Sequence, residues 1–242
     1  MRKVAAQLML LCAACAALAA EDVPSPDPAR WEGAISEFED WDRKNSTPKD
    51  AVLFTGSSSI VAWSTSRDFP QYPVINRGFG GSHLSDVNHF FARIVAAYRP
   101  RVIVLYAGDN DIADGKSPQR IHDDYEVFVG LVRNELPHTH VIFISIKPSL
   151  ARWSAWPRMR QANSLIRELS DHHEHLHFAD IATPMLGPDG KPRPGLFAED
   201  GLHLGDEGYR LWTSVVTPFI ELALARPDRT KPPTVSVRGS AS

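Results

Sequence analysis

The stretch of sequence that decides the fold is AVLFTGSSS, which occupies residues 51–59. It starts with a short apolar run and ends in a glycine that is followed by three serines. A short run that is apolar throughout and stops at a glycine is typical of a strand buried on both faces of a parallel sheet. We therefore expect a strand at residues 51–55 whose carboxyl end delivers the serines to the edge of that sheet.

Similar short apolar segments recur along the chain, and amphipathic helical patterns fill the gaps between them. The expected strands are residues 51–55, 72–76, 101–107, 140–146 and 175–179. The expected helices are residues 31–41, 84–98, 118–135, 154–173 and 206–224. Buried strands that alternate with helices indicate a parallel sheet covered on both faces. The predicted fold is a three-layer α/β/α sandwich on a mostly parallel, five-stranded, doubly wound sheet of the flavodoxin-like kind.

The bulk composition fits one globular domain. The chain has 242 residues, of which 43% are hydrophobic and 23% are charged, and its formal net charge is −3. This length is ample for one buried core and short for two domains, so we expect a single domain over residues 21–225. Residues 226–242 contain few apolar side chains and are predicted to be a disordered tail. The chain has no run of Lys and Arg, which argues against a nucleic-acid partner.

The first twenty residues differ in kind from the rest. Arg2 and Lys3 precede an apolar run at residues 8–18, and the A-x-A pattern of residues 17–19 is soon followed by acidic residues. This order is typical of a secretory signal peptide, which we place at residues 1–20. The apolar run is short for a bilayer span, so we expect no membrane span in the mature protein. The predicted location is the periplasm or the medium.

Cysteine usage agrees with this interpretation. Both cysteines, Cys12 and Cys15, lie inside the expected signal peptide. The mature protein is therefore expected to lack disulfides and cysteine metal sites. A lipoprotein is the weaker alternative, because the leucine expected three residues before Cys15 is absent.

Glycine-containing and polar segments follow the predicted strands. Ligands of open parallel sheets bind outside the carboxyl ends of the strands, so these segments are expected to meet at one edge. They read GSSS at 56–59, GG at 80–81, GDND at 108–111 and DGLH at 200–203. Together they supply a nucleophile, backbone N–H donors, an amide donor and an acid–base pair. That set is sufficient for acyl transfer.

The residue types explain each expected role. A serine where a strand meets a helix has an unpaired N–H and lies in the positive field of the helix start, although the same place also suits a helix cap. Three adjacent serines leave the identity of the nucleophile open at this point. Asp200 and His203 are close enough for the carboxylate to hold one imidazole nitrogen while the other faces a serine. Gly81 and Asn110 offer N–H donors for an oxyanion.

Four blocks of the chain resemble the signature blocks of the SGNH, or GDSL-type, esterases and lipases. They read FTGSSSI at 54–60, NRGFGG at 76–81, AGDND at 107–111 and DGLH at 200–203. The resemblance extends from Val52 to Trp212, and the fold that it implies agrees with the one expected from periodicity.

The resemblance implies a role for each matching position. Ser58 matches the family's nucleophile, and Asp200 and His203 match its acid–base pair. Gly81 and Asn110, together with the Ser58 N–H, match its oxyanion hole. No metal or organic cofactor is implied.

Two neighbouring positions bear on this assignment. Ser57 stands where the family usually has aspartate. Ile60 occupies the position of the last glycine in the G-x-S-x-G pattern that α/β-hydrolases require, which argues against that family.

The favoured hypothesis is a serine esterase that hydrolyses carboxylic esters with a short acyl group, including O-acetyl groups on carbohydrate. An acyltransferase that passes the acyl group to a sugar hydroxyl would use the same triad, so this alternative stays open. A non-catalytic, flavodoxin-like module that binds phosphate or a nucleotide is a third hypothesis, but it leaves the Asp200 and His203 pair without a purpose. No obligate protein partner is evident from the sequence.

Other residues are candidates for substrate contact. His83 follows the glycine pair, while Arg152, Trp153 and Trp156 follow the fourth strand on the same expected edge. We expect these four to lie near the substrate, with core packing as the rival role for the tryptophans.

Further polar residues are assigned structural roles. Asp109 and Asp111 are expected to be solvated or to cap a helix. Four histidines cluster near the end of the helix at 154–173, where imidazolium complements the helix dipole, and no metal site is expected there. They are His172, His173, His175 and His177.

Overall fold

The computed structural model of the chain describes residues 23–225. The signal peptide expected at residues 1–20 and the tail expected at 226–242 lie outside the described residues. Within the described range, no helix combines the length and the apolar character that crossing a bilayer requires.

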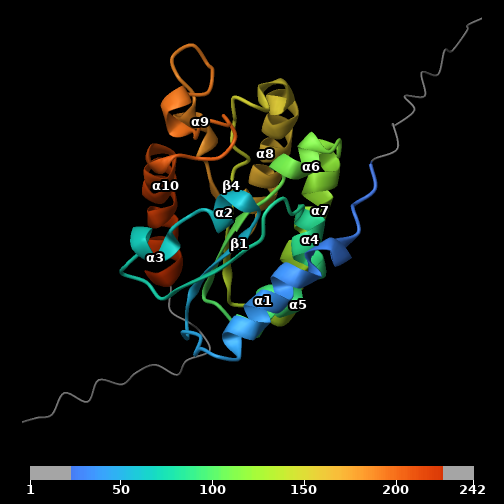
Figure 1. Cartoon of the computed structure of the whole chain (residues 1–242), viewed down its shortest axis with the longest axis vertical. Helices are drawn as coiled ribbons and strands as arrows, with labels where there is room; N and C mark the ends of the chain where they lie inside the picture. The colour runs from blue at the N-terminus through green and yellow to red at the C-terminus, as the bar shows by residue number, and fades with distance from the viewer. Residues whose placement is uncertain (1–22, 226–242) are drawn as a thin grey trace, which may run out of the picture.

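The centre of the fold is a sheet of five parallel strands in the order β2-β1-β3-β4-β5 (Figure 1). The strands are β1 (Val52–Gly56), β2 (Val74–Gly78), β3 (Val102–Tyr106), β4 (His140–Ile144) and β5 (Leu176–Ala179). All five predicted strands are confirmed, with ends shifted by at most two residues. This is the flavodoxin-like order, in which the winding reverses between β1 and β3 and leaves a crevice at their carboxyl ends.

Helices cover both faces of the sheet and complete the predicted sandwich. One face carries α1 (Glu32–Asp42), α4 (Leu84–His89), α5 (Phe91–Ile94), α7 (Pro118–Glu135) and α8 (Trp156–Asp171). The other face carries α2 (Ser58–Val61), α3 (Thr65–Asp68), α9 (Ala182–Met185) and α10 (Asp206–Ala225). The remaining helix is α6 (Asp109–Ala113), and the 3₁₀ turns are η1 (Pro28–Trp31), η2 (Ala96–Tyr98), η3 (Trp153–Ala155) and η4 (Pro194–Leu196).

The two layers have separate cores because successive side chains of a strand point to opposite faces. Leu53 and Ile103 belong to the core under α1, α7 and α8. Phe54 and Val104 belong to the core under α10. All residues of β1, β3 and β4 are buried, which explains why these segments are apolar throughout rather than alternating.

The continuous helix predicted at residues 84–98 is wrong. The chain instead forms α4, α5 and the 3₁₀ turn η2, and Phe90 between the two helices leaves helical geometry. The apolar residues here repeat largely at a spacing of three, which 3₁₀ and α turns share, so the pattern cannot reveal the breaks. The helix expected at 154–173 likewise begins with η3 and continues as α8, whose first turn contains Pro157.

Candidate active site

Ser58 lies at the junction of β1 and α2. Gly56 ends the strand at a φ of +127°, and a Cβ there would lie 1.9 Å from the Tyr106 carbonyl oxygen. Only glycine therefore allows β1 to pass so close to β3. The Ser57 N–H then donates to that same carbonyl at 3.0 Å, which fixes the turn that presents Ser58 at the start of α2.

The three adjacent serines have different surroundings. The Ser58 Oγ lies 3.0 Å from the His203 Nε2. The Ser57 side chain is buried and its hydroxyl lacks a partner among the described residues. The Ser59 hydroxyl is buried and accepts a hydrogen bond from the Lys147 ammonium. Of the three, only Ser58 meets the histidine.

Asp200 and His203 lie on the turn that precedes α10. The His203 Nδ1 is 2.5 Å from the Asp200 Oδ2, and the Asp200 Oδ1 accepts the backbone N–H groups of Leu202 and His203 at 2.9 Å each. The hydrogen bond from His203, with help from the two backbone donors, lowers the pKa of Asp200 to about 2. The ionised carboxylate keeps the proton on Nδ1, so Nε2 faces Ser58 as an acceptor.

The loop after β2 passes beside Ser58. A Cβ on Gly80 would lie 3.8 Å from the Ser58 Cβ, and Gly81 adopts a φ of +76°, which favours glycine. The Trp31 ring packs against Gly81, 3.3 Å from the position that a Cβ would take. Within residues 23–225, neither the Ser58 N–H nor the Gly81 N–H donates to another protein atom. Both protons are therefore free for a ligand.

Asn110 lies in the first turn of α6, after β3. Its Nδ2 donates to the Ser82 carbonyl at 3.1 Å, which joins the β3 loop to the β2 loop. Its Oδ1 accepts from the Arg152 Nη1 at 3.0 Å. One Nδ2 proton remains beyond the bond to Ser82, since an amide nitrogen carries two.

The expectation that Asp109 and Asp111 are solvated is wrong, although both do lie in the first turn of α6. Both side chains are buried. The Asp109 Oδ2 lies 2.8 Å from the Lys147 Nζ, and the Asp111 Oδ1 lies 2.9 Å from the Lys116 Nζ. The two lysines are buried as well. Each therefore compensates its carboxylate for the hydration that is lost on burial.

Lys147 is the functional candidate that sequence reasoning missed. It directly follows the apolar segment of residues 140–146, which is the position where a parallel strand delivers side chains to the catalytic edge. A lysine directly after a buried strand was the one signal in the sequence that a charged side chain lies beneath the site.

The four residues expected near the substrate behave differently from one another. His83 is 1% exposed, and its Nε2 lies 2.8 Å from the Asp114 carboxylate. Its contact with substrate stays a prediction, and this burial argues against it. Arg152 is engaged with Asn110 and Asp109. Trp153 and Trp156 stack on each other. Trp156 also packs against the core, which is the alternative role that the sequence analysis named for the tryptophans.

The histidines near the end of α8 belong to two places. His172 caps α8 and His173 follows it, at the positions expected. An imidazolium at His173 was expected wrongly, because burial and the adjacent Arg133, whose Nη2 lies 2.6 Å from Nδ1, lower the pKa of His173. The His177 Nε2 lies 3.0 Å from the Nδ1 of His140, whose ring also packs on His175. These side chains therefore group along the start of β4 and β5, at the end of the sheet opposite Ser58.

A different group brings three metal-ligand types together. The ligand atoms of His122, Asp123 and Glu126 lie within 4.8 Å of one another on α7. The two acids are exposed, and the spacing follows from neighbouring positions on one helix, an arrangement common on solvated helices.

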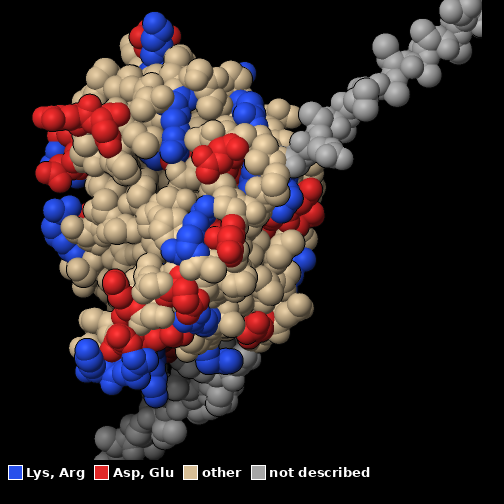
Figure 2. Space-filling view, turned by 45° about the vertical axis from the view of Figure 1, so that its right-hand side comes forward, with Lys and Arg blue, Asp and Glu red and all other residues tan. Residues whose placement is uncertain are grey.

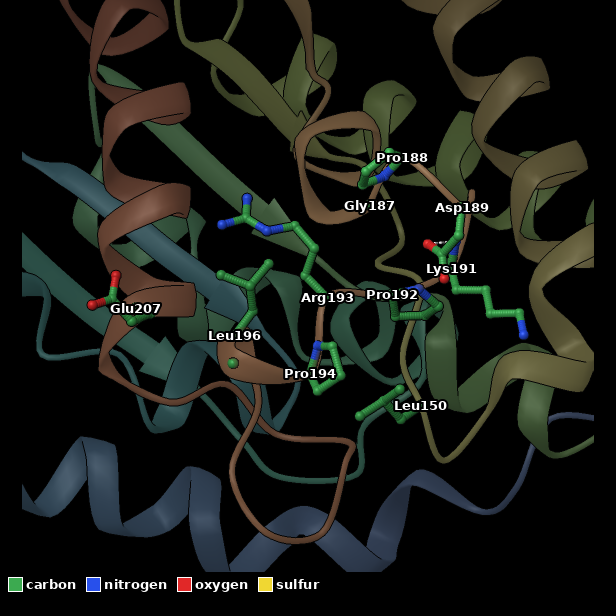
Figure 3. Close-up of a pocket in the computed structure, with 11 residues that line it drawn as sticks. Leu150, Gly187, Pro188, Asp189, Lys191, Pro192, Arg193, Pro194, Leu196 and Glu207 are labelled. Carbon is green, nitrogen blue, oxygen red and sulfur yellow. Dashed lines mark hydrogen bonds between the residues drawn. The ribbon is translucent and has the colours of Figure 1, made fainter.

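Figure 3 shows the residues that line a cavity of about 560 Å³. Its walls come mainly from residues 187–196, with Leu150 and Glu207. A Cβ on Gly201 would lie 3.1 Å from the Leu150 Cβ, so the cavity adjoins the turn. Ser58 and His203 themselves do not line it.

On the face shown in Figure 2, Lys and Arg side chains alternate with Asp and Glu, and no extended basic patch is visible.

Comparison with known proteins gives this geometry a context. Residues 51–211 match the model of the GDSL-like lipase/acylhydrolase family. A search of curated proteins found no match. The matched range contains all four sequence blocks from which the catalytic edge is built.

Solved structures with the same fold cover most of the described residues. A GDSL-like lipase from Bacteroides thetaiotaomicron superposes with a TM-score of 0.69 at 21% identity, covering 78% of this chain and 98% of that chain. An acetyl xylan esterase gives a TM-score of 0.61 at 20% identity, covering 70% and 98%. A mutant of an acetylxylan esterase from Geobacillus stearothermophilus gives 0.58 at 12% identity, covering 70% and 94%. At these identities the likeness concerns the fold.

Proposed function

Since the chain belongs to the GDSL-like lipase/acylhydrolase family and is a carboxylic ester hydrolase, we propose that Ser58 is its nucleophile, with His203 and Asp200 as the acid–base pair. The observation that carries this proposal is the 3.0 Å separation between the Ser58 Oγ and the His203 Nε2, with Asp200 bound to the opposite nitrogen. This is the arrangement that activates a serine hydroxyl at neutral pH.

The proposed reaction passes through an acyl-enzyme. The Ser58 Oγ attacks the ester carbonyl while the His203 Nε2 accepts the hydroxyl proton. The tetrahedral intermediate collapses when its bond to the alcohol breaks and Nε2 returns the proton to the leaving oxygen. A water then gives a proton to Nε2 and attacks the acyl carbon. When the bond between the acyl carbon and the Ser58 Oγ breaks, Nε2 returns that proton to Oγ, which releases the carboxylic acid and restores Ser58.

Three donors are proposed to hold the oxyanion of the intermediate. They are the free N–H groups of Ser58 and Gly81 and the second Nδ2 proton of Asn110. Each comes from a different loop at the crevice between β1 and β3, which suits a ligand at the switch point of the sheet. One such donor typically changes kcat by about 10²–10³-fold.

We propose a short acyl group as the substrate's acid part and carbohydrate as its alcohol part. The support is the absence of a long apolar lid among residues 23–225 and the fold shared with acetyl xylan esterases. Water is favoured over a sugar hydroxyl as the acyl acceptor, because His203 and Asp200 are 39% and 49% exposed and reach solvent directly.

We also propose that the chain is exported to the periplasm or medium after cleavage of residues 1–20. The support is the order of basic, apolar and small residues in the sequence. The amino-terminal residue of the protein recovered from the exported fraction tests this. We expect it at position 20 or 21, and an uncleaved exported chain would contradict the proposal.

The activity test uses p-nitrophenyl esters of increasing chain length and acetylated xylo-oligosaccharides, on wild type and Ser58→Ala. We expect fastest turnover with acetyl, release of free acetate in water, and loss of turnover in Ser58→Ala. Retained turnover in Ser58→Ala would refute the mechanism, and a flat chain-length profile would refute the short-acyl preference. Transfer of acetyl to an added sugar in place of release would favour the acyltransferase.

A further inference from the structure

Arg152 contacts the side chain proposed as an oxyanion donor. It lies in the loop between β4 and η3, and its Nη1 is 3.0 Å from the Asn110 Oδ1 and 3.3 Å from the Asp109 Oδ2. Its side chain is 22% exposed, and both contacts are made by the same guanidinium nitrogen. No step of the proposed reaction uses Arg152 directly.

The contact fixes which way the Asn110 amide points. Arg152 can only donate, and the Ser82 carbonyl at the other end of the amide can only accept. Reversing the amide would set donor against donor at Arg152 and acceptor against acceptor at Ser82. The observed orientation, with Oδ1 on Arg152 and Nδ2 on Ser82, is therefore held from both ends. Because the amide cannot flip, the second N–H bond of Nδ2 points in one fixed direction.

Arg152 is in turn held by a buried carboxylate. Burial alone would raise the pKa of Asp109, but the charges of Lys147 and Arg152 outweigh it and the pKa is lowered. The Lys147 Nζ also donates to the Tyr106 hydroxyl at 3.0 Å and to the Ser59 hydroxyl at 3.2 Å. Two cations share one carboxylate in this cluster, so a net positive charge remains beside Asn110.

We infer that Arg152 is a positioning residue of the oxyanion hole, which orients and polarises the Asn110 amide so that its free Nδ2 proton meets the developing oxyanion. This inference rests on the oxyanion role proposed above for Asn110. A cation at Oδ1 draws electron density from the amide and makes its N–H a stronger donor. A donor held in place before the reaction needs no reorganisation during it, which is the condition for strong electrostatic stabilisation.

The kinetic effect of Arg152→Ala is expected in kcat. Because the guanidinium acts through Asn110, the loss belongs to the transition state and lowers kcat, on the order of tenfold, with KM little changed. In an Asn110→Ala background the same substitution has nothing left to position. A double-mutant cycle on kcat is therefore expected to be non-additive, with Asn110→Ala and the double variant nearly equal.

The test measures kcat, KM and thermal unfolding of Arg152→Ala, Asn110→Ala and the double variant with p-nitrophenyl acetate. Arg160→Ala on α8 is the matched control, because Arg160 is exposed and lies outside the site. Arg152→Lys tests geometry, since lysine keeps the charge without the planar fork and is expected to fall between wild type and Arg152→Ala. Added guanidinium at millimolar concentration is expected to raise kcat of Arg152→Ala and of no other variant.

The possible outcomes separate this inference from the proposed function. If Asn110→Ala retains full kcat, the oxyanion role of Asn110 fails and the inference falls with it. If Asn110→Ala lowers kcat but the effects of the two substitutions add, Asn110 keeps its role and the inference alone is overturned. A change confined to KM would make Arg152 a substrate contact, and a change confined to unfolding temperature would make it structural, and either overturns the inference. Non-additivity in kcat together with guanidinium rescue supports it.

Discussion

The two sides of the candidate site are built differently. The proton-transfer side, Asp200 and His203, stands on an exposed turn that is held by backbone hydrogen bonds. On the oxyanion side, Asn110 is linked through Arg152 to a buried charge cluster in which Asp109 is 6% exposed and Lys147 is 1% exposed. The difference matches the task of each side. Groups that exchange protons with water remain in contact with it, whereas donors that must not move are held by buried charges.

The two sides also differ in how their residues come together along the chain. Asp200 and His203 are three residues apart and meet within one turn. Asp109 and Lys147 are 38 residues apart, and Asn110 and Arg152 are 42 apart, so they meet only when β3 and β4 are paired. We therefore expect substitutions on the proton-transfer side to affect the reaction and spare the fold. On the oxyanion side they are expected to affect both.

The largest effect is expected for His203→Ala. We expect kcat to fall by roughly 10⁴-fold or more, since serine and histidine of a triad act as one unit. The unfolding temperature should change little because the side chain is partly exposed and packs in no core. Steady-state kinetics and thermal unfolding check this, with the exposed His138→Ala as the control. Substantial activity in His203→Ala would show that this side does not carry the proton transfer.

Lys147→Met tests the buried charge cluster. It leaves Asp109 without its closest cation, and breaking a buried ion pair costs about 3–5 kcal/mol of stability. In a domain of this size that lowers Tm by roughly 10 °C. The double variant Lys147→Met with Asp109→Asn should recover part of the loss, because no buried carboxylate is then left without its closest cation. Arg152 also loses Asp109 in that variant, but its side chain is 22% exposed and reaches water. The exposed Lys44→Met is the control. An unchanged Tm in Lys147→Met would show that the oxyanion side does not depend on buried charges for its stability, and so does not differ from the proton-transfer side in this way.

Asn110→Ala is expected to lower kcat by about 10²–10³-fold with KM little changed, as for other oxyanion donors. It also removes the link from Asn110 to Ser82 and so should lower the unfolding temperature slightly. Parallel kinetics and unfolding measure the two effects. A loss of binding in place of turnover would contradict the role given to this side.

The smallest effect concerns acid stability. The pKa of Asp200 is lowered from 3.8 to about 2, chiefly by its hydrogen bond with His203. A carboxyl with a lowered folded pKa stabilises the fold above its unfolded pKa, and that contribution is lost as the pH falls through the folded pKa. The stability difference between wild type and Asp200→Asn should therefore shrink as the pH falls from 3.8 toward 2. Urea unfolding across this range measures it. A difference that does not change with pH would mean that the pKa is not lowered.

The sheet could be predicted from sequence because buried parallel strands are apolar throughout and stop at glycine or polar residues. The carboxyl ends of such strands share one edge, so the sequence alone assigns GSSS, GG and GDND to one site. The turn of Asp200 and His203 was predictable because its geometry is local.

What sequence could not provide depends on distant pairing and on burial. Asp109 is next to Asn110 and resembles part of a solvated acidic loop, because its partner Lys147 lies 38 residues away and is recognised only once the chain is folded. The partner of Asp111, Lys116, is only five residues along the chain, and what the sequence did not reveal there is that both side chains are buried. The break at Phe90 was hidden for another reason, since both kinds of helical turn share the spacing of the apolar residues.

The most direct test of the central claim is the identity of the serine that becomes acylated. Wild type, Ser57→Ala, Ser58→Ala and Ser59→Ala are treated with a fluorophosphonate, and the labelled peptide is mapped by mass spectrometry. We predict one label on Ser58 in every protein except Ser58→Ala, which stays unlabelled, and slow labelling in His203→Ala. A label on Ser57 or Ser59, or undiminished labelling of Ser58→Ala, would contradict the assignment of Ser58 as the nucleophile.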